Sequence, residues 1–329
     1  MTVLVTGAGG FIGRHVVERL LDDGHRVRSL VWPSEHMSQL SWNNHENVEI
    51  VCGDLKDARC RLELVKGVTT VVHLAATRAK SWELQRELTA QHTQAMVEAT
   101  FRAKIAQFVL ASSFSIYDYA CLPRDSAVDE ESPLIADSWE HGPYPWGKLQ
   151  QDQAVRRAGE DHKLPYTILR LGAVYGPGAT WTHRLGIIKG GRCIRFGSSA
   201  RVPLTYVRNV ADAIAATVTC GATNKVLNVV DDDPPTQRQF ASELLAYMNP
   251  RVKVIPISYG LARVGADCLW LVAGCLGQRK QIPLTLRPMC IDAVGKPMMY
   301  PNDRIKQSLE WAPRVNRAEA LRHIFGAPI

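Results

Sequence analysis

Short apolar runs alternate with helix-like repeats through the first half of the chain. Val3–Val5 is a β-branched run, and after it apolar residues recur at three- and four-residue spacing from Ile12 to Leu21, with Gly24 as a helix stop. The same alternation predicts further strands at residues 27–31, 48–51, 70–74 and 108–111. Strands that alternate with helices form parallel sheets covered on both faces, so we expect an α/β fold with a doubly wound parallel sheet.

The later helices of this half are predicted at residues 58–65, 83–102 and 144–159, and the last leads into a strand at 166–170. Residues 114–142 carry prolines and acidic residues with few periodic apolar positions, so they are predicted to form a long, functional loop.

After Gly178 the alternation fades, and the pattern predicts a helix at 210–218, a strand at 226–230 and a helix at 237–248. We therefore expect one domain over residues 1–175, completed by late strands from about 200–230. A smaller mixed lobe is expected over residues 176–329.

The most apolar stretch runs from Leu261 to Gly277, but Arg263 and Asp267 interrupt it and it is too short to span a membrane. Most stripes of this kind belong to a protein core. Two alternatives stay open for residues 261–276: they line an apolar pocket, or they lie on a membrane surface.

Composition narrows the class of protein. The chain has 329 residues and a formal net charge of +7, and its scattered Lys and Arg residues form no basic tail, which argues against nucleic-acid binding. Its eight cysteines follow no paired spacing, so neither a metal site nor a disulfide framework is predicted. We expect reduced thiols, several of them in the core, and a cytoplasmic protein. The first strand begins at Thr2, so no signal peptide is expected.

A glycine-rich turn joins the first strand to the first helix. Gly7, Gly10 and Gly13 are spaced three residues apart, with Phe11 and Ile12 opening the helix. Glycine permits a tight turn and a close approach of the backbone to a pyrophosphate, which the helix N-terminus then attracts. The context of strand, turn and amphipathic helix predicts a dinucleotide-binding site rather than an idle turn.

The end of the second strand bears on the choice of dinucleotide. It reads Leu30-Val31-Trp32-Pro33 and lacks the acidic residue that holds the ribose hydroxyls of NAD. Arg14 and Arg28 are nearby cations for a 2′-phosphate, so among NAD(P) cofactors we favour NADP. Asp54, followed by Leu55, is predicted either to bind the adenine amino group or to cap the next helix.

Tyr144 and Lys148 are four residues apart, which places a phenol and an ammonium on one face of a helix. A nearby cation lowers the pKa of a phenol and makes it a usable acid or base. Ser113 ends the fifth strand at the edge where open α/β sheets bind ligands. These three residues are the predicted catalytic set.

Together these motifs resemble the extended short-chain dehydrogenase/reductase family, the NAD(P)-dependent epimerase/dehydratase group, along essentially the whole chain. The resemblance implies a Rossmann-type fold with a substrate-binding C-terminal lobe, and often a homodimer. It implies that Tyr144 is the general acid/base, that Lys148 holds the ribose and that Ser113 orients the substrate. It adds cofactor contacts at Leu74, Ala75, Ala76 and Leu171. Two positions depart from the family pattern: Thr89 replaces a usual asparagine and Leu171 a usual proline.

Residues after Ser113 narrow the reaction. Dehydratases and decarboxylases of this family tend to carry an acidic residue there, whereas this chain has Phe114 and Ser115. This difference argues against a dehydratase and leaves an epimerase or a ketoreductase.

For the substrate we favour a nucleotide sugar, as used in polysaccharide biosynthesis, with the diphosphate held by cations of the second lobe. The candidate cations are Arg192, Arg195, Arg201 and Arg208, and the predicted substrate contacts are Ser113, Ser115, Arg195 and Arg201. The alternative is a hydrophobic ketone, as in the steroid and dihydroflavonol reductases of the family. A third hypothesis, from a different functional class, is that the protein is a non-catalytic dinucleotide-binding regulator.

Overall fold

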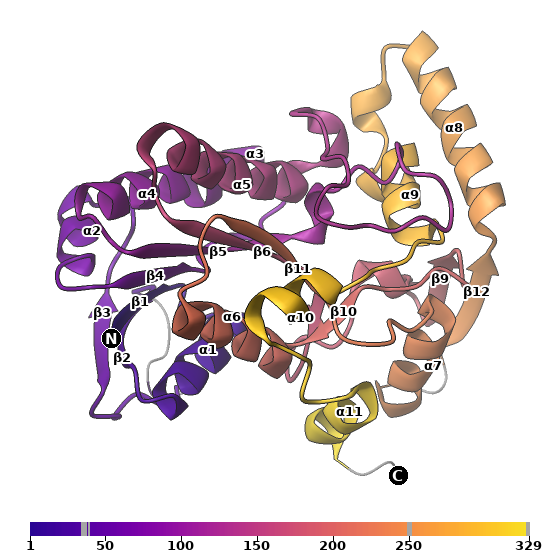
Figure 1. Ribbon diagram of the computed structural model, residues 1–329. Helices are drawn as coiled ribbons and strands as arrows, with labels where there is room; N and C mark the ends of the chain where they lie inside the picture. Colours follow the sequence, from indigo (N-terminus) through magenta and orange to yellow (C-terminus); the bar gives the residue numbers. More distant parts are fainter. Residues whose placement is uncertain (34–37, 39, 249–251, 327–329) are drawn as a thin grey trace.

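The computed structural model describes residues 1–33, 38, 40–248 and 252–326 (Figure 1). Its centre is a seven-stranded sheet in which every pairing is parallel. The strands are β1 (Thr2–Thr6), β2 (Arg26–Val31), β3 (Val48–Cys52), β4 (Thr70–His73), β5 (Gln107–Ser113), β6 (Tyr166–Leu171) and β11 (Lys225–Val229). The strand order is β11-β6-β5-β4-β1-β2-β3, which confirms the Rossmann-type doubly wound sheet.

Helices cover both faces of this sheet (Figure 1). One face carries α1 (Phe11–Asp22), α6 (Val207–Cys220) and α10 (Asp303–Leu309), and the other carries α2 (Ala58–Leu64), α4 (His92–Arg102) and α5 (Pro143–His162). Alternate residues of β1 serve the two faces, because Val3 and Val5 belong to the first core and Leu4 to the second. The chain reverses its direction of travel between β1 and β4, and in such folds ligands bind at this switch point.

The long helix predicted over 83–102 is continuous but irregular. It begins as α3 (Trp82–Leu84), passes through the π-helix η2 (Gln85–Gln91) and ends as α4. Such π-turns are often found at functional sites. Here η2 packs against α5 so closely that a Cβ on Gly147 would lie 2.3 Å from Gln85 Oε1.

The remaining elements gather at one side of the sheet (Figure 1). β7 (Ala173–Tyr175) pairs with β10 (Leu204–Tyr206), while β8 (Ile187–Lys189), β9 (Arg192–Phe196) and β12 (Lys253–Ile257) form a small mixed sheet. The helices there are α7 (Gln237–Met248), α8 (Tyr259–Cys275), α9 (Pro288–Gly295) and α11 (Arg317–Phe325). Short turns of 3₁₀ helix are η3 (Phe114–Ile116), η4 (Trp139–His141), η5 (His183–Leu185), η6 (Arg279–Gln281) and η7 (Leu284–Leu286). The division near residue 175 stays a prediction, with β11 returning to the main sheet beside β6.

Two expectations about burial are wrong. All eight cysteines are free, but Cys193 alone is buried, so the thiols are not a core feature. The apolar segment 261–276 forms α8 and the residue after it, and its large side chains are exposed instead of packed in a core. Among the described helices, none has both the length and the apolar character needed to cross a membrane.

Candidate active site

The glycine-rich turn lies between β1 and α1, and its geometry excludes side chains. Gly7 has a φ of 69°, and a Cβ there would sit 3.1 Å from the backbone nitrogen of Ala75. A Cβ on Gly13 would lie 2.1 Å from the carbonyl oxygen of Gly7. The turn is therefore folded onto the start of α1 and onto the end of β4, and only glycine fits at these two positions.

The N-terminus of α1 fits an anion. Gly10 is the N-cap and provides no side-chain cap, and the first turn contains no acidic residue. Its backbone N–H groups and the positive end of the helix dipole are thus available to a pyrophosphate. Phe11 and Ile12 brace the turn by packing against the core cluster that contains Tyr175 and Val207.

The two cations predicted for a 2′-phosphate lie in different places. Arg14 is exposed in the first turn of α1, beside the predicted phosphate site. Arg28 lies in the middle of β2, where Nε donates to Glu49 Oε2 at 2.7 Å and Nη1 donates to carbonyl oxygens at the end of α2. The structure therefore does not bring Arg28 to the site. Trp32, directly after β2, is half-exposed at the strand end.

Asp54 does not cap α2, because Asp57 is the N-cap and accepts from the Arg59 N–H. Asp54 instead closes a local turn, in which Oδ1 accepts from the Lys56 N–H at 2.8 Å. Its carboxylate remains partly exposed after β3 while Leu55 is buried. The contact of Asp54 with the adenine amino group therefore stays a prediction, and the carboxylate is accessible for it.

Leu74, Ala75 and Ala76 follow β4 directly beside the glycine turn. The Leu74 N–H donates to the Thr6 carbonyl oxygen at 3.2 Å, which ties the two strand ends together. Leu171 is buried at the end of β6, where it is paired in register with Ser113. The predicted cofactor contacts thus lie along the carboxyl ends of β1, β4 and β6.

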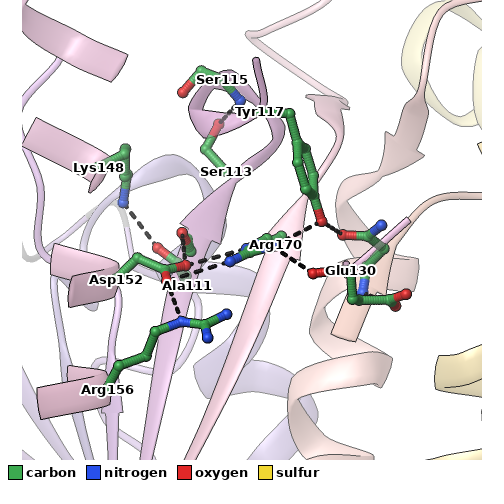
Figure 2. Close-up of polar contacts among 11 residues, drawn as sticks. Ala111, Ser113, Ser115, Tyr117, Glu130, Lys148, Asp152, Arg156 and Arg170 are labelled. Atoms are coloured by element: carbon green, nitrogen blue, oxygen red, sulfur yellow. Dashed lines mark hydrogen bonds and ion pairs between the residues drawn. The ribbon is translucent and has the colours of Figure 1, made fainter. Parts of the chain in front are cut away.

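The predicted catalytic residues come together at this edge. Tyr144 is in the first turn of α5 and Lys148 one turn later. Ser113 ends β5, and its side chain is hydrogen-bonded to the Tyr144 hydroxyl. Lys148 Nζ donates to the Ala111 carbonyl oxygen at 2.8 Å, as Figure 2 shows. The phenol, the ammonium and the serine hydroxyl therefore share one site.

The electrostatics differ from expectation. Burial raises the pKa of Tyr144, while the hydrogen bond from Ser113 and the charge of Arg78 act in the opposite direction. Burial also lowers the pKa of Lys148 to about 7, and Arg78 adds to this effect. Arg78 is thus a cation of the chain, besides the predicted Lys148, whose charge favours the Tyr144 phenolate.

Arg78 was not predicted from the sequence. It is exposed in the loop after β4, where Gln85 of η2 fixes the backbone on either side of it. Gln85 Nε2 donates to the carbonyl oxygens of Thr77 at 2.8 Å and Ala79 at 3.0 Å. The irregular helix therefore holds the loop that carries Arg78, whose charge acts on Tyr144 and Lys148.

A second feature that the sequence did not reveal is a buried polar chain behind Lys148. Gln151 Oε1 accepts from Lys148 Nζ at 2.8 Å, and Gln151 Nε2 lies 2.6 Å from Thr93 Oγ1 and 3.1 Å from the Ala75 carbonyl oxygen. Thr93 in turn bonds His73, and His73 bonds Thr6. The chain links the catalytic helix to the strand that carries the glycine turn.

Several motif residues are structural. Asp152 pairs with Arg156 and with Arg170, whose Nη1 donates to the Tyr117 hydroxyl and to the Glu130 carbonyl oxygen (Figure 2). Asp152 and Arg170 are fully buried, so this paired network fixes the ends of β5 and β6 relative to α5.

The short helix η3 follows Ser113, which is its N-cap. Ser115 donates its backbone N–H to Ser113 Oγ at 3.1 Å, and in the described part of the chain its own buried hydroxyl has no partner. Phe114 is buried in a cluster with Tyr117 and Tyr119. Beyond them Arg184, also missed by sequence reasoning, is buried with its Nη2 donating to the Tyr119 hydroxyl at 3.0 Å.

The four candidate cations of the second lobe do not form one cluster. Arg192 and Arg195 lie on β9, and Arg195 is buried with Nε donating to Ser198 Oγ at 3.2 Å. Arg201 donates to the Pro234 carbonyl oxygen and pairs with Asp233 at 3.5 Å. Arg208 belongs to α6, where its charge acts on Glu18 of α1. Arg195 is therefore the buried member of this set.

Comparison with known proteins shows the family of the chain. The family model described as the NAD dependent epimerase/dehydratase family matches residues 3–229. The chain is 29% identical to the 2-alkyl-3-oxoalkanoate reductase of Stenotrophomonas maltophilia (strain K279a), over 98% of each protein. It is 25% identical to the GDP-mannose 3,5-epimerase of Arabidopsis thaliana, over 98% of this chain and 80% of that protein.

A solved structure has the same fold. The UDP-glucuronic acid 4-epimerase of Bacillus cereus in complex with NAD aligns with a TM-score of 0.71, covering 99% of this chain and 97% of that chain at 19% identity. At this identity the likeness establishes the fold alone.

Proposed function

The chain belongs to the NAD-dependent epimerase/dehydratase family and is an enzyme of the extended short-chain dehydrogenase/reductase type, and we propose that it transfers a hydride between NAD(P) and a carbinol or keto carbon of an anionic substrate. The observation that carries the proposal is the meeting of Ser113, Tyr144 and Lys148 beside the glycine turn. A non-catalytic regulator is not retained, because the family consists of enzymes.

In the proposed mechanism Tyr144 gives a proton to the substrate oxygen during reduction and removes it during oxidation. Ser113 donates a hydrogen bond to the same oxygen and so orients the reacting carbon. Lys148 holds the ribose through the ammonium that Ala111 and Gln151 position. The bound nicotinamide supplies or accepts the hydride. Arg78 favours the phenolate and therefore assists the oxidative direction.

NADP remains the favoured cofactor, but of the two predicted cations only Arg14 still supports it. Arg14 is exposed at the N-terminus of α1 and supports a 2′-phosphate contact, whereas Arg28 is engaged by Glu49 and α2. The strand end at Trp32 offers no carboxylate for ribose hydroxyls.

Ketone reduction or epimerisation is preferred to dehydration. Elimination of water needs an acid or base next to the reacting carbon besides Tyr144. The position after Ser113 is taken by the buried Phe114, and the next by the unpartnered Ser115 hydroxyl of the described site. The Ser115 hydroxyl is suited to bind a substrate oxygen rather than to remove a proton.

For the substrate, we favour a lipophilic 3-oxo acid or its 3-hydroxy form. A 2-alkyl-3-oxoalkanoate carries a carboxylate close to the reacting carbonyl, and the reductase that acts on it resembles this chain along almost its full length. Arg78 is exposed in the loop after β4 and its charge acts on both Tyr144 and Lys148, which supports it as the cation that would bind such a carboxylate. The exposed apolar helix α8 is consistent with a lipophilic substrate.

A nucleotide sugar, favoured on sequence alone, is the second candidate. It is supported by the similarity to GDP-mannose 3,5-epimerase and by the buried Arg195, whose pKa is lowered mainly by burial and further by the charge of Arg238. Two close guanidinium groups suit a diphosphate.

A ligand panel separates these candidates. With NADPH present, medium- and long-chain 2-alkyl-3-oxo acids are expected to raise Tm and to be reduced, whereas UDP and GDP sugars are not. Tyr144→Phe is expected to abolish reduction while cofactor affinity is retained. Full activity of Tyr144→Phe would contradict the proposed mechanism. If nucleotide sugars alone raise Tm, a nucleotide sugar becomes the favoured substrate and the 3-oxo acid is rejected.

Location and assembly remain predictions. The eight free thiols support a reducing cytoplasmic compartment. A homodimer through the α4 and α5 surface is consistent with half-exposed Phe101, which stacks on His162 at 4.8 Å.

A further inference from the structure

We propose that α8 is a membrane-docking helix that lies flat on a lipid surface containing anionic headgroups. The inference starts from large apolar side chains that are exposed to solvent. Five of them belong to α8 and one to Leu276, the residue that follows it. Leu261, Val264, Leu271, Val272 and Leu276 expose between 59% and 68% of their surface, and Leu269 exposes 40%. Isolated exposed apolar residues are common, but a contiguous set on one helix marks an interaction site.

The exposed side chains share one face of the helix. At 3.6 residues per turn they fall, with Cys268 and Cys275, within about half of its circumference, and no charged residue lies in that arc. The opposite face holds the helix to the protein. Ala266 and Ala273 are buried there, and Arg263 Nε donates to Asp292 Oδ1 of α9 at 3.0 Å. The charged pair of α8, Arg263 and Asp267, therefore lies outside the apolar arc, and the apolar side chains of that arc point away from the protein body.

Aromatic and cationic pairs flank both ends of α8. At the N-terminal end the guanidinium of Arg124 lies 5.6 Å from the Tyr259 ring centroid. At the C-terminal end Arg279 lies 5.1 Å from the Trp270 ring, and Lys280 5.8 Å from the ring of Trp139. Both rings lie on the protein-facing side of α8, because Tyr259 bonds Asp292 of α9 and Trp270 stacks on Trp139 of η4. The exposed cations beside them, Arg124 and Lys280, offer positive charge to anionic headgroups at the two ends of the helix. The formal net charge of +7 favours an anionic surface.

The size of the face argues against a second copy of the chain as the occupant. The six exposed side chains lie along a helix about 25 Å long and present roughly a few hundred Å² of accessible surface, less than the ~800 Å² that each partner of a stable interface buries. Figure 1 shows α8 at the outer edge of the molecule, far from the central sheet. A flat lipid surface can therefore reach it without contacting the rest of the fold.

This placement also orients the active site. Trp139 of η4 stacks on Trp270 of α8 with ring centroids 6.1 Å apart, and Arg287 Nη1 donates to the Trp139 carbonyl oxygen at 3.1 Å. Because α5 and Tyr144 follow η4 directly, docking through α8 would bring the start of the catalytic helix near the lipid surface.

The test is cosedimentation of the full chain with phosphatidylcholine vesicles, with and without added phosphatidylglycerol. We expect binding that strengthens with phosphatidylglycerol and weakens with salt. The double variant Leu261→Gln/Leu271→Gln should bind at least about tenfold more weakly. Arg279→Gln and Lys280→Gln should each weaken binding to the anionic vesicles about fivefold. Leu62→Gln, which replaces an equally apolar side chain exposed by 53% on α2, should bind as the unaltered protein does.

The replaced leucine and lysine side chains are exposed, so those variants are expected to keep the circular dichroism and Tm of the unaltered protein. Arg279 is half-buried on Trp270, so Arg279→Gln is expected to keep the circular dichroism but to lower Tm. Absence of vesicle binding, or equal binding by the double variant, would overturn the proposal. Self-association without lipid that the double variant abolishes would overturn it too, because a second copy would then cover α8. None of these readouts depends on the substrate, so failure here leaves the proposed reaction standing.

Discussion

Gln151 Oε1 accepts a hydrogen bond from Lys148 Nζ at 2.8 Å, so the ammonium next to the cofactor site is held by a residue one turn further along the same helix. Both side chains are buried, and within the described residues the other acceptor of Lys148 Nζ is the carbonyl oxygen of Ala111. We therefore expect Gln151 to act as a positioning residue through Lys148.

Replacing Gln151 should disturb the lysine more than the fold around it. Gln151→Leu removes one acceptor of a buried ammonium, so we expect the pKa of Lys148 to fall further and kcat/KM to drop about tenfold. The pH–rate profile should change shape, which a purely structural defect would not cause. Gln150→Leu is the matched control, because Gln150 donates to Asp137 at the surface. An unchanged pH profile in Gln151→Leu would remove the positioning role.

Arg78 should tune Tyr144. A cation stabilises a phenolate, so its removal in Arg78→Gln raises the pKa of Tyr144 and moves the acidic limb of the oxidation profile to higher pH. Because Arg78 is exposed, we expect a loss of at most roughly fivefold at neutral pH. Arg78→Lys keeps the charge and should retain the profile. If the pH–rate profiles of Arg78→Gln and the unaltered enzyme coincide, this role of Arg78 is contradicted.

The lowered pKa of Lys148 should make the free energy of unfolding depend on pH. Its folded-state pKa of about 7 lies below the ordinary value of 10.5, so between these pH values the unfolded chain holds a proton that the folded chain has released. Stability contributed at this site therefore rises as pH increases from about 7 to 10. Lys148→Met lacks this dependence. Denaturant unfolding across this range should show that the free energy of unfolding of the unaltered protein, minus that of the variant, increases with pH. A difference that stays constant would contradict the lowered pKa.

Arg14 and Arg28 form a matched pair for the cofactor preference. Arg14→Ala should weaken NADP binding more than NAD binding, because only NADP carries the 2′-phosphate. Arg28→Ala should leave the ratio unchanged and lower Tm instead, because Arg28 is bonded to Glu49 and to carbonyl oxygens of α2. Equal affinity of the unaltered protein for NAD and NADP would remove the preference.

Patterns that depend on local order were readable from the sequence. The sheet followed from alternating apolar periods, and the glycine turn from positions where a side chain cannot fit, such as Gly13. Tyr144 and Lys148 could be paired because helical spacing alone puts them on one face.

Features that depend on tertiary contacts were not readable. Arg78 has no distinctive sequence spacing, and its role arises because Gln85 of an irregular helix fixes its loop. Arg28 looked close to the cofactor along the chain, but its guanidinium points to α2. The apolar segment at Leu261 was read first as core because composition does not distinguish an inward from an outward apolar face.

The central claim is that Tyr144 supplies the proton as hydride passes between nicotinamide and a substrate carbon. Its most direct measurement is product mass after turnover of a 2-alkyl-3-oxo acid with reduced cofactor that carries deuterium at both C4 positions. We predict one deuterium at the new carbinol carbon with the unaltered enzyme, and no product with Tyr144→Phe, although that variant still binds the cofactor. Deuterium transfer by Tyr144→Phe at an undiminished rate would contradict the account.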